Sequence, residues 1–523
     1  MRPKIGDFEF GEVYGENEVL FLDNYSKYFY DINNSLSKLD RKNKMLVIGR
    51  KGTGKTLLVN VYCNAKRKNN YIAVVESLKD FVFHELTHFQ GQDVSSTKYV
   101  PIFKWMILVN LAKNIVSNKK GFSEDKIVHL ESFLRSFGHV AGELRPEQTV
   151  EITREYQASG EVGIGFRFPV LRGEAKAKDG EVEKTKETKK NYLECMESLQ
   201  CFIVDMLKES NKKIYVFYDE LDDKFDATVE YKNAMISFLN AVVSINKTLM
   251  QNKIDAKIGA VIRHDIINTF SSPNINKIIE DNSVTLDWCS AGERASDSEI
   301  FDMIAFKIKN STDYYNDLNG SNLFGKIFTE RVAGEHSSIY ILHRTLGRPR
   351  DAVRMLTYIQ DEYGENTERF ESSMFTKISK KYSSYLLREI RSELAGHLSD
   401  SEIDDSFSLL RSVKKRGFTP HLIKEKFEEL KLGDGTLTLN KILSCLFKVG
   451  AIGNVLRRSK TDGGDVYLWS FNDEDLEMDP TLNFEIHCGL WDALGIIGND
   501  SNLLIVFYVQ IMPDDFVMQL HRF

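Results

Sequence analysis

The chain has 523 residues, a formal net charge of −7 at pH 7, 42% hydrophobic residues and 28% charged residues. This composition is typical of a soluble globular protein with roughly two to four domains. The acidic balance excludes a protein whose whole surface binds nucleic acid by charge, so any such contact must be local. The six cysteines form no Cys-x-x-Cys pair, which predicts reduced thiols in a cytoplasmic protein.

Neither end of the chain predicts a membrane partner. The N-terminus has no basic stretch followed by an apolar run, so we expect no secretion signal. The longest apolar run, residues 503–512, is far shorter than the ~20 residues that span a bilayer, and we predict a buried strand there. Residues 1–40 are expected to form a helical lead-in, because Leu20, Phe21 and Tyr25 recur at helical spacing.

A phosphate-binding loop is predicted directly after this lead-in. Residues 45–48 are an apolar run typical of a buried strand, and residues 57–62 can continue as a helix. Between them the chain matches the pattern G-x-x-x-x-G-K-[ST], in which backbone N–H groups and a helix N-terminus surround phosphate oxygens. A chance glycine-rich turn is the alternative. The predicted nucleotide-binding residues are Gly49, Arg50, Lys51, Gly52, Thr53, Gly54, Lys55, Thr56 and Leu57.

Two residues of this loop have predicted chemical roles. The Lys55 ammonium is expected to reach the β- and γ-phosphates of ATP. The Thr56 hydroxyl is expected to ligate Mg²⁺. The sequence therefore predicts ATP and Mg²⁺ as cofactors.

A long insertion, about residues 80–205, follows a second predicted strand at residues 71–75. We expect helices at residues 102–116 and 123–137, a hairpin strand at 160–168, and an exposed mixed-charge tract at 173–190. A solvated elaboration without a task is an equal alternative for the whole insertion.

The insertion contains the pattern His84-Glu85-Leu86-Thr87-His88, which matches the zinc-protease motif H-E-x-x-H. Zinc in such a site needs a third ligand, and Val94, which stands at the expected position, cannot ligate. We therefore expect ordinary helix residues and no stoichiometric zinc.

An acidic pair ends the next predicted strand, residues 213–218. Asp219 stands where a carboxylate can hold the Mg²⁺ shell, and Glu220 where one can polarise a water for attack on the γ-phosphate. The alternative is a solvated acidic turn, since Leu221, Asp222 and Asp223 follow.

Further strands at residues 257–263 and 283–287 complete a predicted parallel α/β sheet, because strands alternate with helical segments. Ligands bind such sheets at the carboxyl ends of the strands. Arg263 and Asp265 lie there and are candidates to sense the γ-phosphate. A simple ion pair at the strand end is the even alternative.

Residues 299–387 have a helical pattern and contain the segment Thr345-Leu346-Gly347-Arg348-Pro349-Arg350-Asp351. Pro349 suits the first turn of a helix, and arginine suits a planar grip on phosphate. We predict a helical lid whose Arg350 contacts the γ-phosphate, while Arg348 faces solvent or a neighbouring subunit. The alternative is a capped surface helix with solvated arginines.

The last segment predicts a winged helix. Helices are expected at residues 405–415, 419–430 and 439–447, followed by a hairpin of residues 451–457 and 466–471. The third helix is mostly apolar and leaves few side chains for base edges, which favours a protein-packing or regulatory role over sequence reading.

Together these motifs resemble a poorly characterised family of bacterial P-loop ATPases of the AAA+ type, related in layout to replication-initiator and STAND ATPases. The resemblance rests on Phe10-Gly11-Glu12, Gly15-Glu16-Asn17-Glu18, the phosphate loop, Asp219-Glu220, Arg263-His264-Asp265-Ile266, Gly347 to Asp351, Val449 to Asn454 and His487 to Trp491. It implies Arg263 at the first sensor position and Arg350 at the second. It also implies a role in bacterial antiviral defence or mobile-element biology.

The predicted fold is an α/β P-loop NTPase with a parallel, AAA+-like sheet core, a helical lid and a C-terminal winged-helix-like domain. The predicted domains are residues 1–40, 41–298 with the insertion, 299–395 and 396–523. The leading function is a Mg-dependent ATPase switch that signals to a partner, with Glu220, Lys55, Arg350 and Arg263 as catalytic residues. It is expected to form a homo-oligomer and to act on an effector protein.

Two alternatives stay open. The first is an initiator-type ATPase whose winged helix grips DNA with Arg457, Arg458 and Lys460. The second is a scaffold that binds nucleotide without turnover.

Overall fold

The computed structural model describes residues 2–22, 24–78, 99–136, 192–210, 212–221, 228–270, 273–289, 298–432, 436–458, 464–473 and 476–496. The H-E-x-x-H segment, the predicted strands at 160–168 and 503–512, the charged tract and Lys460 lie outside these residues. The chain forms two compact units. We call residues 35–48 and 58–285 the sheet unit, and residues 1–34, 49–57 and 286–523 the P-loop unit. The predicted domain boundaries stay predictions.

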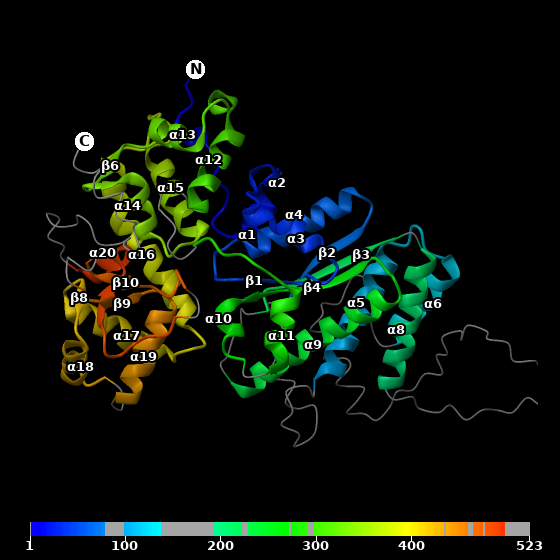
Figure 1. Ribbon diagram of the computed structural model, residues 1–523. Coiled ribbons are helices and arrows are strands. Elements are labelled where there is room, and N and C mark those ends of the chain that lie inside the picture. The colour runs from blue at the N-terminus through cyan, green and yellow to red at the C-terminus, as the bar shows by residue number, and fades with distance from the viewer. Residues whose placement is uncertain are drawn as a thin grey trace, which may run out of the picture. The chain divides into compact units, whose positions relative to one another are not determined.

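All five predicted strands of the sheet unit are confirmed. They are β1 (Leu46–Gly49), β2 (Ile72–Ser77), β3 (Ile214–Asp219), β4 (Ala256–Arg263) and β5 (Ser283–Thr285). The strand order is β2-β3-β4-β1-β5, and β1–β5, β2–β3 and β3–β4 pair in parallel (Figure 1). Strand β4 therefore separates β1, which feeds the phosphate loop, from β3, which ends in the acidic pair.

Alternating aromatic side chains of β3 explain how the sheet is covered on both faces. Tyr215 packs edge-on against Tyr62 of α4 (Lys55–Lys68) at a ring distance of 5.9 Å. Tyr218 points to the other face, where its ring meets Phe238 of α9 (Val229–Gln251) at 5.6 Å. Successive side chains of a strand point to opposite faces, so a continuous apolar strand is buried on both sides. Figure 1 shows α4 and α9 on opposite faces.

The insertion contributes helices to the core of the sheet unit. The predicted helices are confirmed as α5 (Val100–Ser117) and α6 (Glu124–Ser136), and α8 (Tyr192–Glu209) follows. Helix α5 is long and apolar enough to cross a membrane by length and composition, but 72% of that window is buried inside the protein. A buried core helix meets the same criteria, so the described part of the insertion is structural core.

Shorter helices complete the sheet unit. They are α3 (Ser35–Asp40), α10 (His264–Ile267) and α11 (Pro273–Asn282). Lys257, near the start of β4, donates to the carbonyl of Leu39 in α3 and to the carbonyl of Arg41 at 2.9 Å. These bonds hold the end of α3 beside the sheet. Burial lowers the pKa of Lys257 to about 8, although the carboxylates of Asp40 and Asp255 oppose this.

This buried lysine predicts a pH-dependent stability. Between about pH 8 and the unfolded-chain pKa of ~10.4, the unfolded state binds more protons, so the free energy of unfolding rises with pH. One group contributes at most about 1.4 kcal/mol per pH unit. Urea unfolding from about pH 7.5 to 9.5, below the range where tyrosines ionise, should show a rise that Lys257→Met reduces. Equal pH slopes in the two proteins would contradict this explanation.

The N-terminal part of the P-loop unit is only partly helical. It contains the short helices α1 (Gly15–Phe21) and α2 (Tyr25–Tyr28), preceded by a mainly extended segment. The apolar residues that set the predicted helical spacing do not all face a core, because Leu20 and Phe21 are each 73% exposed. The extended segment instead buries Phe8 and Phe10. A buried ion pair, Glu18 with Lys307 at 3.5 Å, ties α1 to the helices that follow.

The predicted helical region is confirmed. It consists of α12 (Glu299–Ser311), α13 (Gly320–Ile327), α14 (Ser337–Arg344), α15 (Pro349–Tyr363) and α16 (Ser372–Leu394), with a two-stranded ribbon of β6 (Arg331–Val332) and β7 (Glu335–His336). Helix α15 begins at Pro349 as predicted, because proline needs no N–H donor in a first helical turn.

The C-terminal part has three helices, α17 (Asp400–Val413), α18 (Pro420–Glu429) and α19 (Thr436–Lys448), and a short α20 (Trp491–Leu494). The predicted hairpin is present as β9 (Ile452–Leu456) and β10 (Val466–Leu468). The predicted two-stranded wing is nevertheless smaller than the sheet that the structure contains. Strands β8 (Gly417–Phe418) and β11 (Asn483–Ile486) extend it to a four-stranded antiparallel sheet of order β10-β9-β11-β8.

The predicted fold class is thus confirmed. A parallel α/β sheet with the P-loop NTPase strand order is followed in the chain by a helical region and by a C-terminal part of helices and a four-stranded antiparallel sheet.

Candidate functional site

The backbone of residues 49–54 forms a glycine-rich turn between a strand and a helix, the arrangement predicted for a phosphate-binding loop. Strand β1 ends at Gly49 and α4 begins at Lys55, so the predicted strand, loop and helix are all present. Gly52 and Gly54 have φ angles of +83° and +90°, a region that side chains with a Cβ rarely adopt. A Cβ on Gly49 would lie 2.6 Å from Thr53 Oγ1, whereas the space beside Gly54 is open for 4 Å. The loop can therefore cradle an anion at Gly54, at the N-terminus of α4.

Hydrogen bonds within the loop and one from Trp288 hold the loop in shape. The Lys55 Nζ donates to the carbonyl of Arg50 at 3.0 Å, and the Thr53 hydroxyl donates to the same carbonyl at 2.8 Å. The indole N–H of Trp288 donates to the carbonyl of Thr53 at 2.9 Å. The Lys55 ammonium has three donors on a flexible stem, so it can transfer a hydrogen bond from Arg50 to a phosphate oxygen.

The acidic pair lies in the sheet unit, at the carboxyl end of β3. Asp219 is 5% exposed, and its Oδ1 accepts a hydrogen bond from the Glu220 backbone N–H at 2.8 Å. Glu220 has a φ of +58°, a left-handed conformation that costs a residue with a Cβ about 1–2 kcal/mol. Its carboxylate accepts a hydrogen bond from the hydroxyl of Ser77 at the end of β2, the residue paired with Asp219 in the sheet.

Strain of this kind is sustained only where the surrounding structure fixes the backbone, and it recurs at functional sites. The two carboxylates have different environments, because Asp219 is buried and accepts a hydrogen bond from a backbone N–H, whereas Glu220 accepts one from the Ser77 hydroxyl. This difference suits a metal ligand and a proton acceptor respectively.

The candidate first sensor, Arg263, ends β4 and is 8% exposed. Its guanidinium is paired with the carboxylate of Asp265, with Nε 2.9 Å from Oδ1. The ion pair that was the alternative prediction is therefore present. A role for Arg263 in sensing phosphate stays a prediction.

The segment between α14 and α15 is bonded to the phosphate loop, with which it shares the P-loop unit. Arg348 Nη1 donates to the carbonyl of Lys51 at 3.2 Å, and the Arg350 backbone N–H donates to the carbonyl of Gly52 at 3.4 Å. In return, Arg50 Nη1 donates to the carbonyl of Leu346 at 3.0 Å. A change in the conformation of the loop would therefore alter the hydrogen bonds at the start of α15.

The expectation that Arg348 faces solvent or a neighbouring subunit is wrong. Its side chain is fully buried. Its Nε lies 2.7 Å from Asp351 Oδ2, and its Nη1 forms an ion pair with Glu393 of α16. The two carboxylates raise the pKa of Arg348 against the opposing effect of burial. A buried arginine requires such partners, because an unpaired charge in the core costs several kcal/mol. Sequence reasoning missed Asp351 and Glu393 as these partners.

Arg350, the candidate second sensor, contacts three segments. Its Nη1 lies 3.0 Å from Glu389 Oε2 on α16, and its Nε donates to the carbonyl of Val13 at 3.1 Å. Its guanidinium lies over the ring of Tyr14 at 5.0 Å. Its aliphatic stem lies beside Gly52, where a Cβ would approach it to 3.1 Å. Arg350 thus lies beside the loop, while its grip on a γ-phosphate stays a prediction.

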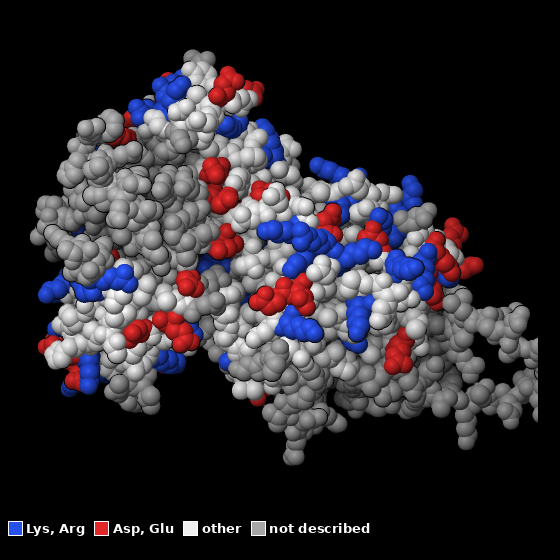
Figure 2. Space-filling view, viewed as in Figure 1, with Lys and Arg blue, Asp and Glu red and all other residues white. Residues whose placement is uncertain are grey.

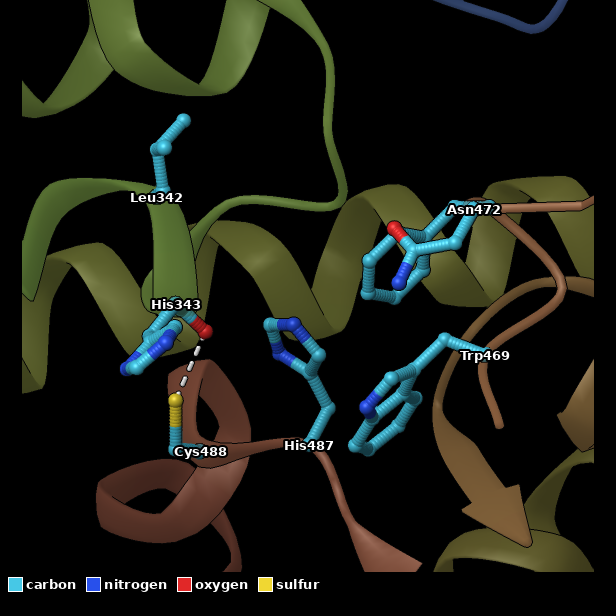
Figure 3. Close-up of a pocket in the computed structure, with 7 residues that line it drawn as sticks. Leu342, His343, Trp469, Asn472, His487 and Cys488 are labelled. Carbon is cyan, nitrogen blue, oxygen red and sulfur yellow. Dashed lines mark hydrogen bonds between the residues drawn. The ribbon is translucent and has the colours of Figure 1, made fainter. Parts of the chain in front are cut away.

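The segment that follows β10 also contacts the phosphate loop. The Arg50 guanidinium lies 5.8 Å from the ring centre of Phe471, and Phe471 stacks on Trp469 at 5.5 Å. His487 meets both rings edge-on, and in Figure 3 its ring lies between His343 and Trp469. Burial lowers the pKa of His487 to about 3, so its imidazole is neutral.

This cluster packs α14 against the sheet. The Cys488 Sγ lies 2.7 Å from the carbonyl of His343 (Figure 3). The cavity between them is about 30 Å³, which is room for a water molecule and far too little for a nucleotide. The cluster therefore has a packing role, holding α14 against the residues that follow β10 and β11.

Comparisons with known proteins give one partial family match. A family model described as the FunZ-associated C-terminal helical domain matches residues 298–391, the stretch that carries Arg348, Arg350 and Glu389. No curated protein matches the chain.

Similar solved structures share little sequence with the chain. The Aeropyrum pernix Orc1 protein in complex with DNA is 11% identical over 95% of this chain and 97% of that one, with a TM-score of 0.36. Cdc6p from Pyrobaculum aerophilum is 13% identical over 93% and 94%, with a TM-score of 0.31. Thermotoga maritima RuvB is 13% identical over 88% and 94%, with a TM-score of 0.28. Likeness this distant says nothing of ligand or activity.

Proposed function

We propose that the protein binds ATP with Mg²⁺ at the loop of residues 49–57 and hydrolyses it. The observation that carries this proposal is the loop itself, in which Gly52 and Gly54 have left-handed backbones and Lys55 opens a helix. Thr56 would hold Mg²⁺ through its hydroxyl, and Asp219 is the proposed acidic ligand. Bound Mg²⁺ would neutralise charge on the phosphates.

In this proposal the residues of the chain divide the work. Backbone N–H groups at Gly54 and Lys55 bind phosphate oxygens, and the Lys55 ammonium adds a point charge. Glu220 releases the Ser77 hydroxyl and accepts a hydrogen bond from the attacking water. Arg350 and Arg263 are the proposed groups that respond to the γ-phosphate.

We further propose that ATP hydrolysis switches the protein between two conformations. Support comes from the hydrogen bonds that join the loop to residues 346–350, and from the contact of Arg50 with Phe471. A ligand shifts a conformational equilibrium only through contacts that differ between the two states, and these contacts touch the loop directly. The output would pass from α15 and the C-terminal sheet to an effector protein. Homo-oligomerisation and a role in bacterial antiviral defence belong to the same proposal.

Nucleotide binding can be tested by thermal or urea unfolding of the full chain. MgATP at about 100 times its Kd should raise the free energy of unfolding by about 2.7 kcal/mol. The effect should shrink when a chelator removes Mg²⁺. An unfolding curve unmoved by millimolar MgATP would contradict the proposed function.

DNA binding is the second candidate, favoured by the polar exposed face of α19, which carries Asn440, Lys441 and Lys448. Two of the basic groups in this part are already paired, Lys441 with Glu402 at 2.7 Å and Arg457 with Asp465. On the face shown in Figure 2, basic and acidic side chains of the described residues are interspersed. A gel shift on duplex DNA at rising salt separates DNA binding from the ATPase switch. Only a DNA-binding protein should shift the duplex, and its phosphate contacts should weaken steeply with salt.

A further inference from the structure

Glu389 lies where three parts of the P-loop unit meet. It stands on α16 and is 6% exposed. Its Oε2 lies 3.0 Å from Arg350 Nη1 and 3.6 Å from Lys51 Nζ, while its Oε1 accepts a hydrogen bond from the Tyr14 hydroxyl at 3.2 Å. One carboxylate oxygen is therefore shared by a cation of the phosphate loop and a cation of α15.

The carboxylate of Glu389 is ionised. Burial opposes ionisation, but the nearby charges of Lys51 and Arg350 hold its pKa below the ordinary value. Two cations thus share one anion. Arg348 differs, because it has two carboxylates of its own, Asp351 and Glu393. Of these three cations, Lys51 and Arg350 are therefore the two that have only one carboxylate partner between them.

A phosphate group on the loop would compete with Glu389 for these cations. Lys51 is a loop residue, and Arg350 packs beside Gly52 of the same loop. A γ-phosphate carries more charge and more acceptor oxygens than a carboxylate, so it can replace the carboxylate as their partner. ADP lacks that group and competes less well.

We propose that Glu389 sets the affinity of the site for ATP and its preference for ATP over ADP, by holding Arg350 and Lys51 until a γ-phosphate displaces it. This inference rests on the proposed function, since it assigns a specificity-determining residue to the same loop. Glu389 touches no phosphate in this scheme and acts through Arg350 and Lys51. Release of the two cations from α16 would also be the first movement of the switch.

The test is Glu389→Gln, which keeps the size and hydrogen-bonding ability of the side chain and removes its charge. Equilibrium titration with MgATP and MgADP should show ATP binding tightened roughly tenfold, on the scale of one charge-assisted contact, and ADP binding changed less. Glu393→Gln is the matched control, one helical turn away with the same substitution. In Glu393→Gln, Arg348 still has its ion pair with Asp351, so no cation is released and the affinity for ATP should not rise.

A second arm separates this effect from a merely structural one. In Arg350→Ala, adding Glu389→Gln should give much less of the tenfold gain, because one of the two cations for which Glu389 and the γ-phosphate compete is absent. Should Glu389→Gln fail to fold, Glu389→Asp withdraws the carboxylate by one methylene and should give a smaller gain of the same sign.

The outcomes separate the two proposals. Wild-type protein that binds no MgATP would overturn the proposed function. Wild-type protein that binds MgATP, with Glu389→Gln binding it equally or more weakly, would overturn only the assignment of Glu389. An equal gain in Glu393→Gln would show a general charge effect and would also overturn that assignment.

Discussion

Lys55→Ala is expected to abolish ATP turnover and to weaken ATP binding strongly. The Lys55 ammonium is 3.0 Å from the Arg50 carbonyl at the mouth of the loop, where it can turn to a phosphate oxygen. Alanine keeps the helix and its N–H donors but removes the point charge on the β- and γ-phosphates. A charged hydrogen bond of this kind contributes about 1.5–3 kcal/mol, and more in the transition state as charge shifts on the phosphates.

The measurement is phosphate release from MgATP together with equilibrium nucleotide binding. Lys68→Ala is the control, because Lys68 is exposed at the far end of the same helix. It should turn over ATP at the wild-type rate. If Lys55→Ala also hydrolyses ATP at that rate, the loop is not the catalytic site.

Glu220→Gln is expected to keep ATP bound while hydrolysis slows by roughly 10²-fold or more. Glutamine can keep the hydrogen bond from Ser77 and fits the same left-handed backbone, so the fold around β3 should be preserved. It cannot accept a proton from water as a carboxylate does. Asp219, which is buried and bonded to the Glu220 N–H, is unchanged.

Single-turnover kinetics with MgATP would measure this loss apart from binding. Glu76→Gln is the matched control, since Glu76 stands one residue before Ser77 and accepts a hydrogen bond from Asn114 at 3.3 Å. It should hydrolyse ATP normally. Loss of ATP binding rather than turnover in Glu220→Gln would make Glu220 a structural residue.

The strands and the phosphate loop could be predicted because their signals are local. Strand β3 is a run of six buried residues, and the glycines at 52 and 54 stand where the backbone must turn left-handed. Strands β8 and β11 could not be predicted, since β8 has two residues and pairs with a strand more than sixty residues away in the chain. Their stability comes from the sheet and not from their own sequence.

The partners of the arginines were also beyond the sequence. Glu389 and Glu393 stand four residues apart on α16, a spacing that places both on one helical face. That spacing is equally typical of a solvated surface, so it could not show that both are buried. The prediction that Arg348 is exposed was wrong because its burial depends on Asp351 and on α16, the helix that follows α15.

In the proposed switch, ATP and ADP place the loop and its neighbours in different states. Hydrogen exchange of the full chain measures this directly, with Glu220→Gln holding ATP unhydrolysed. We predict that ATP, compared with ADP, changes protection in residues 49–57, at the start of α15 and around Glu389 in α16. Identical exchange in these segments with ATP, with ADP and without nucleotide would contradict the proposed switch.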